Sequence, residues 1–495
     1  MSGFIGGVHR QQTVLFPETL DDYVSGENPV RFIDAFVDSL DLRAMGFTHA
    51  APLDEGRPPY DPSVLLKLYL YGYLNKVRST RRLERECQRN VEAMWLMGKL
   101  APDFKTIADF RRDNCEHLRS VFRELVALCK GLDLLDTDLV AIDGSKFKAM
   151  NSPKRHFTPA SLKVSLATLD EKIARYLREL DENDKKEARE ERLPSRIPDL
   201  EAKIAKLKER REQHAALLSR MEISGETEVS LTDPDSRMMR THGTFDLCYN
   251  TQIAVEAKNK LIVAYDVSNR ASDDKELASM AERAREAIGV ERLNAVADKG
   301  YFSGPQVQAC TENGITPFVP EINVRSGAAM REGISPKFTK DRFHYDRASD
   351  VVVCPAGHRM DPLGPGFNLG GKPGHIARRG QAYRTRECSY CPHFMGPCTH
   401  DPKGRQIIRD EFENAMDAMR ERVRTSEGRR IVRLRQELVE HPFGTLKRGF
   451  QQGHLLLRGL RKTTGEMGLS LIAYDMRRVI NIVGTNRLVA ATYRA

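Results

Sequence analysis

Two short apolar runs that each lead into an aspartate constrain the fold of this chain more than any other feature. Residues 139–142 precede Asp143, and residues 293–297 precede Asp298. A carboxylate at the end of a buried strand is costly unless a cation holds it, so the pair indicates a cation site. Glu440, which stands before His-Pro-Phe-Gly, adds a third acid. Mg2+ prefers such oxygen ligands, and three acids suit two ions about 4 Å apart and phosphodiester chemistry.

The composition favours an anionic partner. The chain has 495 residues, a net charge of +9 and a pI near 9.0, and 40% of its residues are hydrophobic. This is enough for two to four packed domains, although many ordinary enzymes are equally basic. No apolar run approaches the roughly 20 residues of a membrane helix, and the first residues lack the apolar core of a signal peptide. We therefore expect a cytoplasmic protein with no membrane partner.

Residues 1–135 have helical patterns. Asp61 can cap a helix that starts at Pro62, and Ser79 or Thr80 can cap the next one. A third helix is expected from about Thr106. Short helices with arginines on one face fit a helix-turn-helix-like DNA-binding unit, and a generic helical bundle with solvated arginines is the alternative. The arginines of the second helix that we expect to bind DNA are Arg81, Arg82 and Arg85.

Residues 136–320 predict a mixed sheet covered by helices. The expected elements are a strand at 139–143, a turn at Gly144, a second run at 146–150, a hairpin of strands 251–256 and 261–267, a helix from Asp273, the strand before Asp298, a helix at 303–313 and a strand at 315–319. Strands in hairpins followed by strand–helix–strand alternation are typical of such an α/β fold. Asp143 and Asp298 could then lie side by side at its centre.

An insertion at 158–224 has a coiled-coil period. Apolar positions spaced 4, 3, 4, 3, 4 run from Leu162 to Leu180 and again from Leu200 to Leu218, with a charged, proline-bearing stretch between them. This pattern predicts an antiparallel helical hairpin that projects from the sheet. Arg211 and His214 fall on the seam of the second arm, so packing there must loosen or meet a partner.

A cysteine cluster marks residues 321–405. Cys354, Cys388, Cys391 and Cys398 have the spacing C-x33-C-x2-C-x6-C, with histidines interleaved. One true C-x2-C pair is a moderate signal for a structural Zn2+ site, and the alternative is that these cysteines only pack. The other five cysteines are scattered, as small core residues of a reducing compartment would be.

The last part, 406–495, has helical patterns at 410–440 and 464–484. Glu440 and Lys447 are two helical turns apart, but Pro442 between them indicates a kink or a new helix. Glu437, one turn earlier, is the rival third acid. Lysines beside the acids, Lys146 and Lys299, together with Lys447 and Arg448, are expected to contact DNA phosphates.

The chain resembles the DDE transposases of bacterial insertion sequences. The motifs that carry the resemblance are Gln-Thr-Val-Leu-Phe-Pro at 12–17, Asn-Pro-Val-Arg at 28–31, Tyr-Asp-Pro at 60–62, Thr-Ile-Ala-Asp-Phe-Arg at 106–111, Ile-Asp-Gly-Ser-Lys at 142–146, Tyr-Asn-Thr-Gln at 249–252, Ala-Asp-Lys-Gly-Tyr at 297–301 and Val-Glu-His-Pro-Phe-Gly at 439–444 with Lys447. Their order makes the match specific, and it covers nearly the whole chain.

The resemblance implies an all-α DNA-binding domain at 1–135 and a ribonuclease H-like core in two parts, 136–320 and 406–495. The hairpin 158–224 and the Cys-rich, zinc-binding segment 321–405 are then insertions. The family's Tyr-Arg-Glu-Lys signature fits Arg435, Glu440 and Lys447, but Val432 takes the tyrosine position and four residues, not three, separate Arg435 from Glu440. Arg435 is thus also expected to contact DNA.

In function, the resemblance implies that Asp143, Asp298 and Glu440 bind two Mg2+, for which Mn2+ can substitute. They would activate water to nick the ends of the element and then align the freed 3′-OH for attack on target DNA. The implied partners are double-stranded DNA, as terminal inverted repeats and target, and a second copy of the chain in a nucleoid-associated synaptic complex. The alternatives are a ribonuclease H-like nuclease that only hydrolyses, and a non-catalytic, transposon-derived DNA-binding protein.

Overall fold

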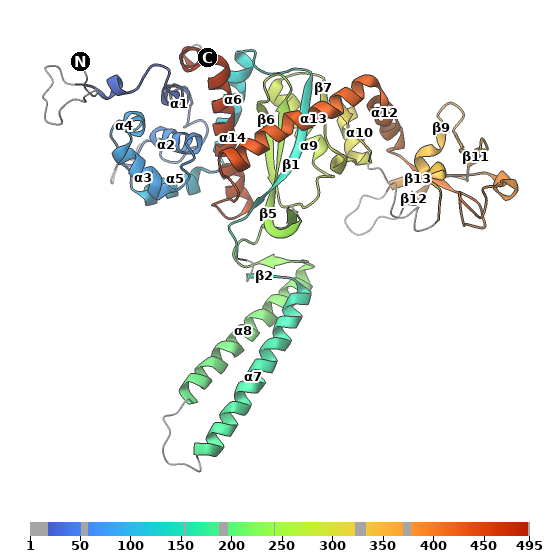
Figure 1. The fold of residues 1–495 in the computed structure, drawn as a ribbon, viewed down its shortest axis with the longest axis horizontal. Coiled ribbons are helices and arrows are strands. Elements are labelled where there is room, and N and C mark those ends of the chain that lie inside the picture. The colour runs from blue at the N-terminus through green and yellow to red at the C-terminus, as the bar shows by residue number, and fades with distance from the viewer. Residues whose placement is uncertain are drawn as a thin grey trace, which may run out of the picture.

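The computed structural model describes residues 18–50, 58–152, 155–187, 197–241, 243–321, 333–369 and 378–493. The motif at 12–17 and residues 188–196 between the two coiled-coil arms lie outside these ranges. Figure 1 shows a group of helices beside a central sheet, a long helical hairpin that projects from the sheet, and a smaller β-rich region on the far side. None of the helices in the described ranges combines the length and apolar character needed to cross a membrane.

The N-terminal region is helical, as expected. Asp61 accepts a hydrogen bond from the Ser63 amide and Pro62 is the first residue of α2, so this cap is as predicted. The third predicted helix begins earlier than Thr106, because Asp103 accepts hydrogen bonds from the amides of Lys105 and Thr106. The helices are α1 (Pro29–Asp38), α2 (Pro62–Leu74), α3 (Thr80–Arg89), α4 (Val91–Leu96), α5 (Phe104–Asn114) and α6 (Leu118–Gly131).

A six-stranded mixed sheet forms the centre. Its strands are β1 (Leu139–Lys148), β4 (Arg237–Thr241), β5 (Thr244–Glu256), β6 (Ile262–Ser268), β7 (Leu293–Val296) and β8 (Ile315–Phe318). β4 and β6 both pair with β5, and β5 is followed by β1, β7 and β8. The pairs among β6, β5 and β1 are antiparallel, whereas β1, β7 and β8 run parallel.

The predicted turn at Gly144 is wrong. β1 runs unbroken through Asp143 and Gly144, and its residues 140–148 pair in register with residues 256–248 of β5. The Gly-Ser pair after Asp143 suggested a turn, but the continuous ladder to a long partner strand overrides this local preference. Asp143 therefore lies within a strand, and successive side chains after it alternate between the two faces of the sheet.

Helices cover the sheet and share its core. α9 (Leu277–Ile288) connects β6 to β7, and α10 (Gly304–Glu312) connects the parallel strands β7 and β8. After the β-rich region come α12 (Glu413–Arg424), α13 (Ser426–Gly444), α14 (Leu460–Val483) and α15 (Thr485–Thr492). One apolar cluster contains residues of the N-terminal helices, of the sheet and of α14. Phe443 of α13 packs on Phe147 of β1, so α13 crosses the face that bears Asp143 (Figure 1).

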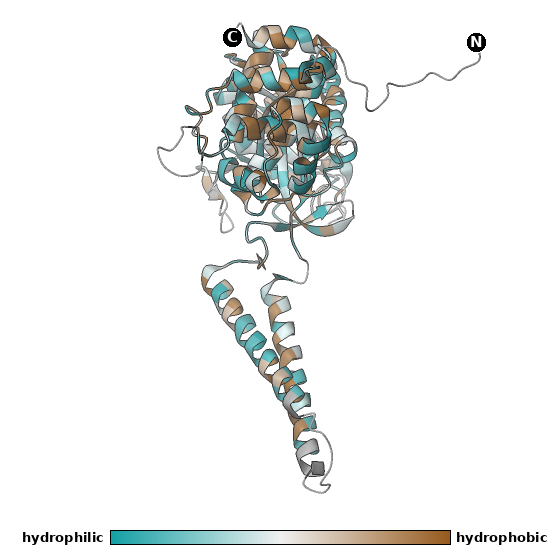
Figure 2. Cartoon of the chain, turned by 90° about the vertical axis from the view of Figure 1, so that its left-hand side faces the viewer, coloured by the Kyte–Doolittle hydropathy of each residue, from teal (hydrophilic) through white to brown (hydrophobic). Residues whose placement is uncertain are grey.

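The insertion forms an antiparallel hairpin of α7 (Pro159–Glu187) and α8 (Ile197–Ser224), with the short strands β2 (His156–Phe157) and β3 (Val229–Ser230) at its base. Leu162 and Leu217 belong to one small apolar cluster between the arms. The hairpin stands well away from the rest of the chain (Figure 2). On the seam Arg211 pairs with Asp170, and buried His214 bonds to the hydroxyl of Ser165. Both polar residues thus have partners inside the hairpin.

His214 makes the hairpin sensitive to pH. Burial, and then the charge of Arg210, hold the pKa of His214 below its ordinary value of 6.5. The unfolded arm binds the proton more readily, so the hairpin loses stability as pH falls below about 6.5 and keeps it above. Amides of α8 should therefore exchange faster at pH 5.5 than at 7.5, after correction for intrinsic rates. His214→Leu should abolish the difference, and equal protection at both pH values in the wild type would contradict this prediction.

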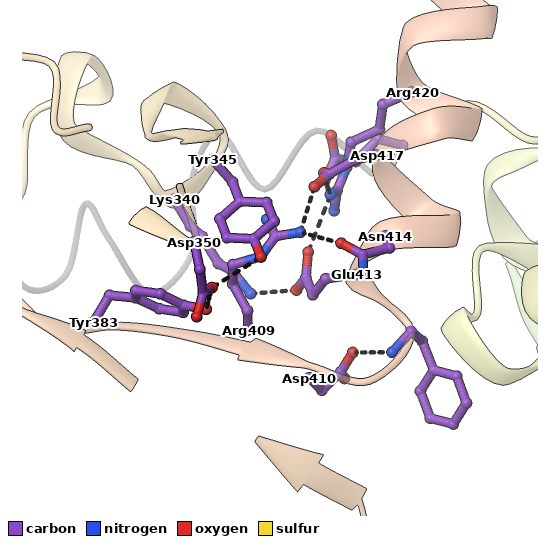
Figure 3. A network of polar contacts seen from close by, with 12 residues as sticks. Lys340, Tyr345, Asp350, Tyr383, Arg409, Asp410, Glu413, Asn414, Asp417 and Arg420 are labelled. Carbon is purple, nitrogen blue, oxygen red and sulfur yellow. Dashed lines mark hydrogen bonds and ion pairs between the residues drawn. The ribbon is translucent and has the colours of Figure 1, made fainter. Parts of the chain in front are cut away.

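The region before α12 is a second six-stranded sheet. Its strands are β9 (His344–Asp346), β10 (Val351–Val353), β11 (Arg359–Pro362), β12 (Phe367–Leu369), β13 (Arg378–Arg384) and β14 (Ile407–Asp410), all paired antiparallel. Figure 3 shows the polar network that joins it to α12. Arg409 of β14 bonds to Asp417 at 2.7 Å, and Arg420 bonds to Asp417 at 2.7 Å and to Glu321 at 3.1 Å. The network thereby ties this region to the chain segment after β8.

Candidate active site

Asp143 lies on β1, and Asp298 comes two residues after the end of the neighbouring strand β7. Ala141 of β1 pairs with Val296 of β7 in a parallel ladder, and each aspartate comes two residues later. The pKa of Asp143 is raised to about 6, mainly by burial and further by the negative charge of Asp298, while Arg435 opposes the rise. The repulsion between the two carboxylates is what a cation placed between them would relieve.

Each carboxylate also has its own contacts. Oδ2 of Asp143 lies 3.4 Å from Nη1 of Arg435, and Oδ1 accepts a hydrogen bond of 2.9 Å from the Gly144 amide. Asp298 caps a short 3-10 helix and accepts a hydrogen bond of 2.7 Å from the Gly300 amide. Asp298 thus caps the turn that follows its strand, as strand-end aspartates often do, and its charge still acts on Asp143.

Arg435 approaches Asp143 from α13, which does not break at Pro442. The helix continues to Gly444 and then passes into a π-helical turn at Thr445–Gly449. The prediction of a new helix at Pro442 is therefore wrong. Pro442 and Leu438 are buried against the core, and this packing outweighs the one hydrogen bond that the proline cannot donate. The helix is held on the sheet along its whole length.

Glu440 is exposed, and its Oε1 accepts a hydrogen bond of 2.7 Å from Gln436. It is five residues after Arg435, which places it roughly 140° around the helix from the side chain that meets Asp143. Lys447, two turns further on, reaches β1 and donates to the Ser145 hydroxyl at 2.6 Å. Glu440 therefore stands beside the acid pair on α13 without converging on it. Its rival Glu437 is also exposed and lines a separate groove.

The acid pair fits a divalent cation in part. Asp143 and Asp298 supply hard oxygen atoms and repel each other, and the buried Nη1 atom of Arg435 makes no hydrogen bond beyond its ion pair. In the described ranges, however, no three His, Cys, Asp or Glu side chains converge closely enough to hold a metal. Asp143 and Asp298 therefore offer carboxylate oxygens to a cation, and the exposed Glu440 does not converge on them.

A fourth acid, Asp273, lies behind the pair and was missed in the sequence. Its Oδ1 accepts hydrogen bonds of 2.6 Å from both Asn250 and Gln252, and Lys146 lies 3.3 Å from its Oδ2. The sequence suggested that Asp273 starts a helix, but α9 begins only at Leu277. The available signal was Tyr-Asn-Thr-Gln at 249–252, whose alternate side chains Asn250 and Gln252 point to one face.

Lys146 was expected to contact DNA phosphates beside the acid pair, but the network holds it on the other face of the sheet. Lys146 pairs with Asn250 in the ladder, so its side chain lies on the Gly144 face, opposite that of Asp143. Its ammonium group is held by Asp273 and its side chain is only 17% exposed. The structure therefore places Lys146 in the packing behind the acids. Lys447 lies on the Asp143 side, where burial lowers its pKa.

The remaining predicted DNA contacts are spread over the molecule. Lys299 and Arg448 are exposed near the acids, on the 3-10 helix after Asp298 and at the π-helical turn after α13. Arg81, Arg82 and Arg85 are exposed on α3, in the helical group away from the sheet (Figure 1). The guanidinium group of Arg81 stacks over the Phe104 ring at 5.0 Å. The two groups of cations are therefore two separate surfaces.

The four clustered cysteines lie near one another in the β-rich region. Burial and then the other cysteines raise the pKa of Cys388, and burial also raises the pKa of Cys398 to about 11. The Arg405 amide donates a hydrogen bond to Cys388, and this contact acts to lower the pKa of Cys388. All four are free and partly exposed, and their sulfur atoms do not converge as metal ligands.

Two family models match the chain. Residues 18–113 match the family described as Transposase domain (DUF772), and residues 353–480 match the family described as Transposase DDE domain. The first match covers η1 (Leu20–Tyr23) to α5, and the second covers Glu440 and all four clustered cysteines. No curated protein and no solved structure matches the chain. The two transposase models, matched in this order, support the chain as a DDE transposase of an insertion sequence.

Proposed function

We propose that this transposase cuts DNA at the ends of its element and joins the freed ends to target DNA in a metal-dependent reaction. The observation that carries the proposal is that Asp143, on β1, feels the charge of Asp298, which comes two residues after the parallel strand β7. A ribonuclease H-like core is part of the proposal. It is supported by the strand order β6, β5, β1, β7, β8, in which the first three strands are antiparallel and the last three parallel.

In this reaction Asp143 and Asp298 would hold divalent metal, two Mg2+ or Mn2+ ions when Glu440 joins them. Bound metal lowers the pKa of water and stabilises charge on the attacking and leaving oxygens. Arg435, which is paired with Asp143, would turn to a DNA phosphate once the carboxylate has another cation. Lys447 is already fixed by Ser145 on the acid side of the sheet, where it can neutralise a phosphate.

Double-stranded DNA and a second copy of the chain are the proposed partners. Two ends of one element must be held together before they are joined, and this favours a homodimer. The exposed arginines of α3 are proposed to hold terminal-repeat DNA while the acid pair acts on the end.

The test uses purified protein, Mg2+ and DNA that carries the inverted repeats flanking the reading frame, and it scores nicked and joined strands. We expect both nicks and joined products, and neither with EDTA. Nicks alone would replace the proposal with a hydrolytic nuclease. Binding without cleavage would replace it with a non-catalytic DNA-binding protein.

We also propose that Cys354, Cys388, Cys391 and Cys398 hold a structural Zn2+ ion. The four cysteines lie near one another beside one small sheet, and the Arg405 amide donates to Cys388, which supports this proposal. Zinc binding would draw together sulfur atoms that do not converge in the structure. Metal analysis of protein purified without chelator should find about one zinc per chain. Cys388→Ser with Cys391→Ser should lose the zinc, whereas Cys310→Ser, at a buried cysteine of α10, should keep it. Protein that contains no zinc would contradict the proposal.

A further inference from the structure

An open groove lies on the solvent side of α13, next to the acid pair but separate from it. It has a volume of about 350 Å3 and is lined by Ser426, Arg429, Arg430, Arg433, Leu434 and Glu437. The opposite side of the helix, with Ile431, Leu438 and Val439, is buried in the core. The groove is thus a fixed surface, because packing on that side sets the position of α13.

The charges in this groove are not balanced. Arg430 pairs with Glu427 at 2.8 Å. Arg429 and Arg433 are exposed, and within the described parts of the chain neither has an acid within 4.0 Å. Glu437 is the one acid among the lining residues. Two guanidinium groups are therefore available for an anionic partner.

These arginines are in line with Glu440. Arg433 and Glu440 come 4 and 11 residues after Arg429, so the three side chains point within roughly 40° of one another around the helix axis. From Arg429 to Glu440 the helix rises roughly 16 Å. This corresponds to roughly five nucleotides of one strand of a duplex. We call Arg429 and Arg433 the arginine stripe. An anion that follows this stripe from the groove would arrive at Glu440 and then at Lys447.

We infer that Arg429 and Arg433 hold the sugar–phosphate backbone of the DNA strand beside the cut and guide it along α13 to Glu440. This inference rests on the proposed function, whose site it extends by a second surface. A repeating polyanion fits the stripe better than a single small anion, because the two guanidinium groups lie one helical turn apart and are both exposed. Backbone contacts of this kind fix the register of the DNA without reading its sequence.

The test compares the salt dependence of DNA binding for the full-length wild type and Arg429→Ala/Arg433→Ala, with fluorescence anisotropy of a labelled end duplex. Each lost phosphate contact lowers the slope of log affinity against log salt by about 0.9, so we expect a slope smaller by about 1.8. The loss should be equal for end DNA and unrelated DNA of the same length. Arg429→Lys/Arg433→Lys, which keeps both charges, should retain the wild-type slope.

The control is Lys130→Ala/Arg292→Ala. Both residues are exposed near the starts of β1 and β7, at the end of the sheet opposite the acids, and their removal changes the net charge equally. Its slope should equal that of the wild type. A wild-type slope in Arg429→Ala/Arg433→Ala would overturn the inference. If this variant has the smaller slope but the wild type neither nicks nor joins DNA, the proposed function fails and the DNA-binding stripe remains.

Discussion

Asp143→Asn should abolish strand cleavage and joining, with a loss of at least about 10³-fold, or about 4 kcal/mol in the barrier. Asparagine keeps the volume of the side chain but removes the charge that a divalent metal requires. The fold should survive, because the substitution relieves repulsion between this half-buried carboxylate and Asp298. Cleavage and joining are measured on end DNA with Mg2+, and the folded state is checked by thermal unfolding.

A matched control for this variant is Asp133→Asn. Asp133 has a side chain that is 95% exposed and a positive φ of 55°, a conformation that asparagine tolerates well. The Asp133→Asn variant should cleave and join DNA like the wild type. If Asp143→Asn also retained wild-type joining, the assignment of Asp143 to the chemistry would be wrong.

Gly144→Ala should damage both stability and activity, because this position has no room for a side chain. A Cβ atom there would lie 2.3 Å from Nε2 of Gln252 and 2.8 Å from Oδ1 of Asp273. The side chains behind the acid pair would have to move, and overpacking of this kind lowers the free energy of unfolding by about 1–3 kcal/mol. Since Gly144 follows Asp143 in β1, the carboxylate should shift and joining should fall.

Denaturant unfolding and the joining assay measure the two effects of Gly144→Ala. The control is Gly131→Ala at the end of α6, where nothing lies within 4 Å of an added Cβ. It should match the wild type in both measurements. Gly144→Ala with unchanged stability and activity would show that the Gln252–Asp273 network does not constrain this strand.

Much of the site could be predicted because its main residues sit on regular local patterns. The apolar runs before Asp143 and Asp298 predicted strands, and both strands are in one sheet. The heptad spacing predicted two antiparallel helices. Residues of the two arms, such as Asp170 and Arg211, do meet across the hairpin. In each case one local pattern of apolar residues was enough to predict the secondary structure.

The remainder depended on contacts that no local pattern contains. Asp273 could not be recognised from its neighbours, because its donors come from β1 and β5 and meet it only in the fold. Lys146 was misplaced for a related reason: without the turn at Gly144, strand alternation directs it away from Asp143. Pro442 predicted a helix break, but burial of the surrounding helix face retains the helical path.

The position of Glu440 is where structure and resemblance differ most. The resemblance implies that this acid joins the other two, whereas the side chain is exposed and bonded to Gln436. The proposed cation site would draw it inward, and the arginine stripe on the same side of α13 would bring the DNA to it. Both the cation and the DNA would therefore meet at Asp143 and Asp298.

The most direct test of Asp143 and Asp298 as a metal site is Mn2+ binding to the complex of protein and end DNA. The binding is measured by electron paramagnetic resonance. The wild type should bind Mn2+, and both Asp143→Asn and Asp298→Asn should lose most of this binding, while Asp133→Asn should retain it. If the two site variants bind Mn2+ as tightly as the wild type, Asp143 and Asp298 are not a metal site.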